Sequence, residues 1–160
     1  FLEKFGGHMA AAGLTLKEEN FLAFRESFEE TVKNSIQESQ RIPTIEIDKE
    51  IKLKEISSSF KKILHQMGPF GPENMNPTFL SKDLVATDVR AMGKDGEHLR
   101  FLVHQRSERM TFTAIGFKLG NTKDKLILGV PFDAVYTLEQ NYWQGKATWQ
   151  MNIKDIRFHE

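Results

Sequence analysis

The chain has 160 residues, of which 39% are hydrophobic and 28% charged, a composition typical of an ordinary globular protein. It has no cysteine, which excludes disulfides and thiolate metal sites, and its net charge of zero excludes a strongly basic field for nucleic acid. No stretch approaches the ~20 consecutive apolar residues of a membrane span, and Phe1–His8 lacks the basic start and apolar core of a secretory signal. We therefore expect a cytoplasmic protein with no membrane partner.

The beginning of the sequence predicts that the chain is a fragment. Its first residue is Phe1 rather than Met, and a Gly-Gly pair follows almost at once. We expect a longer protein whose upstream part holds the chemistry.

A long amphipathic helix is predicted over Lys17–Gln37, after a short strand at Leu14–Leu16. Its apolar residues recur every three or four positions and form one stripe: Phe21, Phe24, Phe28, Val32 and Ile36. Such a stripe is typical of a helix that faces a hydrophobic core. We expect it to pack on the region Thr44–Ile56 or on a second copy of the chain.

The next segments lead to a domain boundary. Alternating apolar and polar residues predict a strand at Thr44–Asp48, and Ser57–Met67 is predicted as a second helix with Ser57 as its N-cap. Gly68–Pro77 contains three prolines and two glycines, which no regular element accommodates. We place the boundary at this connector.

Strand-like segments dominate the rest of the chain. A turn signal at Gly93–Gly96 and a longer connection at Lys118–Val130 lie between them. Five strands are expected, at Phe79–Met92, Leu99–Gln105, Met110–Phe117, Phe132–Gln140 and Ala147–Phe158. Five strands with a long connection between the third and the fourth are the outline of an OB-fold barrel.

Gly6, Gly7 and His8 form the first candidate site. Backbone N–H groups of a glycine-rich loop before a helix can hold phosphate, although a tight turn with a packing histidine remains the alternative. The five histidines are not spaced as close metal ligands, and no Asp/His cluster, nucleophile elbow or P-loop is visible. We expect no catalytic residue, metal or cofactor in this fragment, and no activity of the fragment alone.

The second half of the chain carries the candidate residues for single-strand binding. Residues 77–160 have a net charge of +2 against −2 for residues 1–76, and single strands bind where aromatic faces and cations lie together. The candidates are Arg100, His104, Arg106, Tyr142, Trp143 and Lys146. By alternation, the first three share the face opposite Leu99, Phe101 and Val103, and the last three lie in the loop expected at Asn141–Lys146 between the fourth and fifth strands. A solvated face, with aromatic residues that cap the barrel, is an equally open interpretation. Trp149 alternates with Met151 and Ile153, so we expect it in the barrel core.

Three motifs resemble those of one family, in the same order. Phe5–Leu16, FGGHMAAAGLTL, resembles the signature near the end of the DHH-associated domain, which other DHH phosphoesterases and alanyl-tRNA synthetase share. Gly68–Phe79, GPFGPENMNPTF, resembles the connector before the OB-fold of RecJ exonucleases, and Leu138–Arg157, LEQNYWQGKATWQMNIKDIR, is similar to their final hairpin. Two residues depart from the pattern: Glu73 stands where many members have glycine, and Met75 where many have proline.

This resemblance implies an α+β fold with two domains. Residues 1–67 would be the end of a DHH-associated domain, made of helices with a few strands, and residues 68–78 a Pro/Gly connector. Residues 79–160 would form a five-stranded OB-fold barrel that binds nucleic acid.

The resemblance also implies a function for the intact protein. It would be a metal-dependent hydrolase that degrades single-stranded DNA from the 5′ end in repair and recombination, with Mg²⁺ or Mn²⁺ held by a DHH domain outside this chain. Gly6, Gly7 and His8 would contact a substrate phosphate. Single-stranded DNA and a single-strand-binding protein are the expected partners.

Two alternatives remain open. A purely structural barrel that touches no DNA fits the neutral charge. An RNA-directed module of another DHH-family phosphoesterase fits the shared Gly-Gly-His motif, although the connector and the final hairpin favour RecJ.

Overall fold

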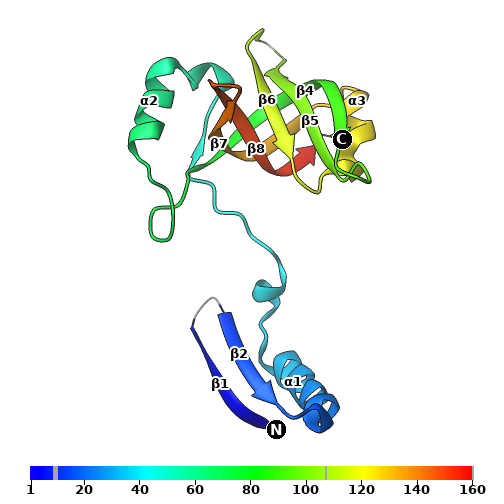
Figure 1. Ribbon diagram of the computed structural model, residues 1–160. Coiled ribbons are helices and arrows are strands. Elements are labelled where there is room, and N and C mark those ends of the chain that lie inside the picture. Colours follow the sequence, from blue (N-terminus) through cyan, green and yellow to red (C-terminus); the bar gives the residue numbers. More distant parts are fainter. Residues whose placement is uncertain (9–10, 107, 160) are drawn as a thin grey trace. The chain divides into compact units, whose positions relative to one another are not determined.

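The chain divides into two units, Phe1–Ile45 and Glu46–Glu160. The computed structural model describes residues 1–8, 11–106 and 108–159. Figure 1 shows a strand hairpin and a helix in the first unit and a barrel flanked by helices in the second. In this described part, no helix is long and apolar enough to cross a membrane.

The first unit begins with a hairpin in which strand β1 (Leu2–His8) pairs antiparallel with strand β2 (Ala11–Leu16). The expectation of a glycine loop before a helix is wrong, because Gly6 and Gly7 lie within β1 and a second strand follows. Gly7 has a packing reason: a Cβ there would lie 2.9 Å from the Cα of Ala12, which is opposite on β2.

Helix α1 (Phe21–Ser35) follows a 3₁₀ turn at Glu18–Asn20, which confirms the predicted helix, and a second 3₁₀ turn lies at Glu38–Arg41. The expectation that its stripe is core is wrong within this unit. Helix α1 has no buried residue, and Phe21 and Phe28 are 52% and 57% exposed. The physical reason is that an amphipathic stripe is buried only by a second surface opposite it, which the described residues of Phe1–Ile45 do not supply.

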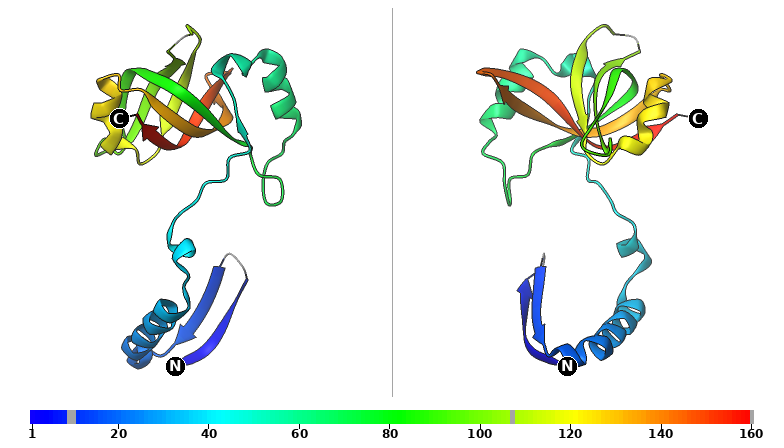
Figure 2. Two further views of the ribbon diagram at one scale, coloured as in Figure 1. Left: turned by 180° about the vertical axis from the view of Figure 1, so that it is seen from behind. Right: turned by 45° about the vertical axis from the view of Figure 1, so that its right-hand side comes forward.

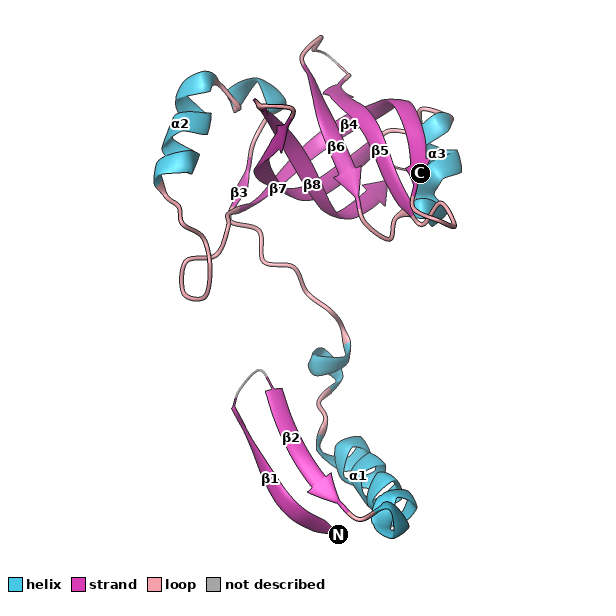
Figure 3. Ribbon diagram, viewed as in Figure 1, coloured by secondary structure: helices cyan, strands magenta, loops and turns pink. Residues whose placement is uncertain are grey.

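The second unit is a barrel. Its strands are β3 (Lys49–Glu50), β4 (Thr78–Met92), β5 (His98–Gln105), β6 (Thr111–Gly116), β7 (Phe132–Trp143) and β8 (Lys146–Phe158). They form one sheet in the order β3-β4-β5-β6-β8-β7, and β4 also pairs with β7, so β4 to β8 close into the predicted five-stranded barrel (Figure 3). Helix α3 (Lys123–Ile127) lies in the long connection between the third and fourth barrel strands, and helix α2 (Ser58–Gln66) lies at the opposite end of the barrel (Figures 1 and 2).

The barrel core extends into the segment before the connector. In β5 the residues Leu99, Phe101 and Val103 are fully buried, and burial of each such side chain contributes about 1.5–3 kcal/mol. Four buried residues of the same cluster precede the connector: Ile51, Leu53, Ile56 and Leu64. The packed unit therefore begins at Glu46, whereas the sequence grouped residues 46–67 with the first domain.

Polar side chains fasten this segment to the barrel. The Gln105 side-chain oxygen accepts a hydrogen bond from the Leu53 N–H at 2.9 Å. The Ser81 hydroxyl lies 2.7 Å from the Ile51 carbonyl oxygen and 2.8 Å from the Tyr136 hydroxyl. Burial raises the pKa of Tyr136 to about 12, so the phenol remains protonated and able to donate.

Two elements were predicted before the connector. The helix at Ser57–Met67 is confirmed, and the strand at Thr44–Asp48 is wrong. The Ser57 hydroxyl caps α2 by accepting a hydrogen bond from the Phe60 N–H at 3.1 Å. The strand lies at β3, parallel to β4, rather than at Thr44–Asp48. The Asp48 carboxylate instead accepts a hydrogen bond from the Thr78 N–H at 2.8 Å, and alternation alone makes no strand where no neighbour pairs with it.

The connector is held by one side chain. The Asn74 amide donates to the carbonyl oxygens of Met67 and Pro69 at 3.0 and 2.9 Å. Glu73 beside it has φ +67°, a left-handed conformation that favours glycine and costs another residue roughly 1–2 kcal/mol. A glycine at this position would adopt that backbone without strain.

Candidate nucleic-acid interface

Strand β5 presents its polar side chains on the outer face of the barrel. Arg100, Leu102 and His104 alternate with the buried residues and are half-buried, which confirms the predicted division of this strand into two faces. Across β6, Arg100 lies opposite Ile115 and His104 opposite Thr111. The outer face thus combines the charge of Arg100 with an imidazole and apolar side chains, and a positively charged face is one part of a single-strand-binding site.

A second arginine lies directly opposite Arg100. In the antiparallel register of β4 with β5, Arg90 pairs with Arg100, so the two side chains share the outer face. Like charges at such positions repel each other, and a bound phosphate would relieve that repulsion. The side chains of Arg90 and Arg100, called the arginine pair below, place two positive charges side by side on this face, of which that of Arg90 is partly offset by Asp88.

A bulge in β4 creates the arginine pair. The register shifts by one residue between Thr87 and Arg90, and Asp88 at the bulge has φ +50°. Without this shift Arg90 would lie opposite Leu99, whose side chain points into the core. The Asp88 carboxylate also accepts a hydrogen bond from the Arg90 Nε at 2.9 Å, which fixes the guanidinium. Because no simple alternation survives a bulge, the sequence analysis missed Arg90.

Phe117 is a second residue that the sequence analysis missed. It follows β6 directly, is 55% exposed, and its ring centroid lies 5.2 Å from that of His98 in an edge-to-face contact. The Lys118 N–H donates to the His98 Nδ1 at 3.0 Å, which holds the imidazole in place. The sequence signal that could have identified Phe117 is a large aromatic residue followed by lysine at the end of a strand.

Arg106 lies just beyond the end of β5. Its backbone N–H donates to the Asp83 carbonyl oxygen at 3.2 Å, and its guanidinium lies 3.8 Å from the Asp83 carboxylate. This exposed pair leaves the cation accessible to solvent.

The candidate aromatic residues lie in the hairpin between β7 and β8. Gln144 and Gly145, with φ of +47° and +75°, form its two-residue turn, which is tighter than the predicted Asn141–Lys146 loop. Tyr142 is 68% exposed, and its hydroxyl donates to the Gln140 side-chain oxygen at 2.8 Å. Lys146 is exposed, and the Trp143 side chain lies outside the described part of the structure.

Gly6, Gly7 and His8 lie together in the exposed strand β1. Their register partners on β2 are Gly13, Ala12 and Ala11, so the three candidates share one stretch of a hairpin made mostly of small residues. Their contact with phosphate stays a prediction.

No group of three or more His, Cys, Asp or Glu that could hold a metal ion occurs among the described residues. The most concentrated polar network lies instead at the end of the barrel strands. The buried Asp133 carboxylate accepts hydrogen bonds from the Arg157 guanidinium at 2.8 Å and from the Asp83 N–H at 3.2 Å, and lies 2.7 Å from the His159 Nε2. Burial by itself raises the pKa of Asp133, but these hydrogen bonds outweigh it and hold the pKa below its ordinary value. This network ties β7 to the end of β8 and is structural.

The strand order, the closed barrel and the helix between its third and fourth strands define an OB-fold domain. Residues 47–155 match the family model of the RecJ OB domain, and the chain belongs to that family.

Relatives over the whole chain carry the same family name. The chain is 30% identical over 159 residues to the single-stranded-DNA-specific exonuclease RecJ of Bacillus subtilis (strain 168), covering 99% of this chain and 20% of that protein. It is 26% identical over 155 residues to the RecJ of Escherichia coli (strain K12), covering 96% of this chain and 26% of that protein. The chain thus spans about a quarter or less of the length of these relatives.

A solved structure supports the fold. The crystal structure of RecJ in complex with Mn²⁺ from Thermus thermophilus is similar with a TM-score of 0.68 at 23% sequence identity, covering 99% of this chain and 22% of that one.

Proposed function

We propose that this chain is the C-terminal portion of a 5′→3′ single-stranded-DNA exonuclease of DNA repair and recombination, and that its barrel binds the single strand. The observation that carries the proposal is the match of residues 47–155 to the RecJ OB domain, with relatives named as single-stranded-DNA-specific exonucleases. The expected cellular location is the cytoplasm, and the expected protein partner is a single-strand-binding protein.

The outer face of the barrel supplies two kinds of contact in this proposal. The arginine pair binds a backbone phosphate, because two guanidinium groups can donate several charge-assisted hydrogen bonds to its oxygens. Phe117 offers an exposed ring on which a base can stack. His104, Arg106, Tyr142, Trp143 and Lys146 extend the site toward the other strand ends and the β7–β8 hairpin.

The first unit has a different role in this proposal. Phe1–Ile45 belongs to a DHH-associated domain, and Gly6, Gly7 and His8 contact a substrate phosphate near the catalytic centre. Their exposure in β1 supports the proposal, because backbone N–H groups reach a ligand only where no side chain covers them.

Hydrolysis takes place outside this chain. Structures of the Thermus thermophilus RecJ contain Mn²⁺ or Mg²⁺, and a divalent ion would activate water for phosphodiester cleavage. The described residues do not fit such ions, since they offer no group of three suitable ligands. We propose that this chain holds and positions substrate and contributes no metal ligand.

Fluorescence anisotropy with labelled single-stranded DNA, duplex DNA and single-stranded RNA tests this proposal. We expect the full chain to bind single-stranded DNA most tightly and to lose affinity as salt rises, since phosphate contacts release counterions. Absence of binding to all three probes would favour a structural barrel. A preference for single-stranded RNA would favour an RNA-directed module.

A further inference from the structure

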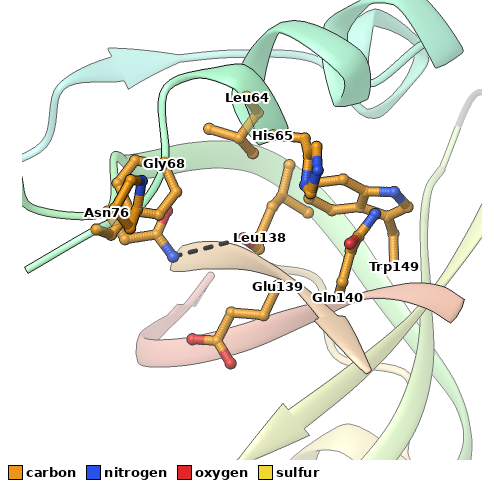
Figure 4. A pocket seen from close by; sticks show the side chains of 10 residues that line it. Leu64, His65, Gly68, Asn76, Leu138, Glu139, Gln140 and Trp149 are labelled. Atoms are coloured by element: carbon orange, nitrogen blue, oxygen red, sulfur yellow. Dashed lines mark hydrogen bonds between the residues drawn. The ribbon is translucent and has the colours of Figure 1, made fainter. Parts of the chain in front are cut away.

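A cavity of about 480 Å³ lies between helix α2, the connector and the strands β7 and β8. Its volume falls within the range of about 300–1,000 Å³ that small-molecule sites occupy. Figure 4 shows Leu64 and His65 entering from α2 on one side, and Leu138, Gln140 and Trp149 from the strands on the other. This cavity is called the α2–β7 pocket below.

One wall of the pocket is aromatic. Trp149 was expected in the barrel core, but it is only half-buried: it packs against the core and also lines the pocket. It lies opposite Gln140 in the register of β7 with β8, and Leu138, which is buried, forms part of the floor. The pocket therefore offers a flat apolar surface beside polar groups.

Two amide side chains supply complementary polar atoms. The Asn76 amide nitrogen lies 3.5 Å from the Leu138 carbonyl oxygen, whereas its Oδ1 is buried and has no partner among the described residues. The Gln140 side-chain oxygen accepts the Tyr142 hydroxyl, so the Gln140 amide N–H groups remain available. A buried acceptor without a partner is destabilising, and a ligand that donates to it would recover that loss.

The charges around the pocket disfavour phosphate as the ligand. Among the residues that the structure describes, no lysine or arginine lines it. Glu139 belongs to the lining, but its side chain points away from the other labelled residues in Figure 4, and its carboxylate accepts hydrogen bonds from Thr137 and Asn152. The ligand that fits is neutral and flat, with a donor and an acceptor along its edge.

We propose that the α2–β7 pocket takes one nucleobase of a bound single strand, stacked on Trp149, with its edge between Asn76 Oδ1 and the Gln140 amide N–H. This inference rests on the proposed function. Each of the four bases carries a donor and an acceptor on its pairing edge, so such a site tolerates any sequence. A phenylalanine side chain of a peptide would leave Asn76 Oδ1 unpaired. The Tyr142–Gln140 hydrogen bond joins the pocket to the β7–β8 hairpin.

The first test compares variants of the full chain by anisotropy with labelled oligothymidylate and an abasic oligonucleotide of equal length. We expect Trp149→Leu to weaken binding of oligothymidylate about tenfold, as the loss of one stacked base would. Trp149→Phe should retain most of the affinity, and neither change should alter binding of the abasic strand. Gln66→Ala, an exposed position on α2 that does not line the pocket, is the matched control.

A second measurement is independent of any loss of folding in Trp149→Leu. The chain has two tryptophans, so the tryptophan emission that Trp149→Phe removes from the unmodified chain is that of Trp149. Oligothymidylate should quench its emission, and the abasic strand should not. Binding by anisotropy without quenching would overturn the pocket assignment alone and would point to a peptide side chain as its occupant. Absence of binding to the unmodified chain would overturn both this inference and the proposed function.

Discussion

The two units of the chain differ in what holds their helices and strands. Among the described residues, none of Phe1–Ile45 is buried, whereas Glu46–Glu160 has one continuous core that includes Leu53, Phe101 and Tyr136. Both units nevertheless have regular hairpins and helices. The local sequence pattern is therefore sufficient to specify a helix or a strand. Its apolar residues contribute to stability only where a second surface packs against them and buries them.

The largest expected effect concerns the core of the second unit. Phe101→Ala should lower the free energy of unfolding of that unit by about 3–5 kcal/mol, because the lost burial and the cavity add. Phe28→Ala on α1 should change the free energy of unfolding of the first unit by less than ~0.5 kcal/mol, since that ring is mostly exposed. Urea unfolding measures both changes, followed by tryptophan fluorescence for the second unit, which holds both tryptophans, and by circular dichroism for the helix of the first. Equal losses for the two variants would contradict the contrast between the units.

An ion pair whose carboxylate is buried and an ion pair that is exposed on both sides should differ in the same way. Asp133→Asn should destabilise the second unit by about 1–3 kcal/mol at neutral pH, because Arg157 and His159 lose a charged acceptor. The pKa of Asp133 is lowered in the folded state, so its contribution is present above the ordinary carboxylate pKa of about 4 and is lost as pH falls through the folded pKa. The variant should therefore lose less stability than the unmodified chain on acidification.

Glu29→Gln is the matched control for this prediction. Its partner Lys33 lies 3.1 Å away, and both side chains are more than 60% exposed. Exposed pairs contribute about 0–1 kcal/mol, so thermal unfolding at several pH values should barely distinguish this variant from the unmodified chain. A larger loss for Glu29→Gln than for Asp133→Asn would refute the structural role of the Asp133 network.

The smallest effect concerns backbone strain, which the described residues show only in the second unit. All non-glycine residues with positive φ lie there: Glu73, Asp83, Asp88, Lys118 and Gln144. Glu73→Gly should raise stability by about 0.5 kcal/mol, because relief of the left-handed conformation exceeds the added chain entropy of glycine. Glu73→Ala, which keeps the strain, should not. A gain for alanine equal to that for glycine, measured by urea unfolding, would show that φ is not the cause.

The sequence could predict elements that depend on local pattern. The alternation of β5 and the Ser57 cap of α2 both follow from neighbouring residues, and the structure confirms them. It could not predict that Gly6 and Gly7 lie in a strand, because glycine permits both conformations. Nor could it predict that the apolar stripe of α1 is exposed, because burial of such a stripe depends on whether another surface faces the helix.

The candidate site was harder to predict, because it depends on register between strands. Arg100 was found from alternation alone, but Arg90 reaches the outer face only through the bulge at Asp88. Trp149 was assigned to the core because alternation does not reveal where a barrel is open to a pocket. Bulges and pockets are tertiary features that a single strand does not encode.

The central claim is that the outer face of the barrel binds single-stranded DNA through the arginine pair. The most direct test is the salt dependence of affinity for labelled single-stranded DNA, measured for the unmodified chain, for Arg90→Ala/Arg100→Ala and for Arg25→Ala/Lys33→Ala, which removes the same charge from exposed positions on α1. The arginine pair binds one phosphate, and each lost phosphate contact reduces the slope of log K against log salt by about 0.7 for a single strand, so the first double variant should lose about 0.7 and the second none. Equal slopes for all three proteins would contradict the account.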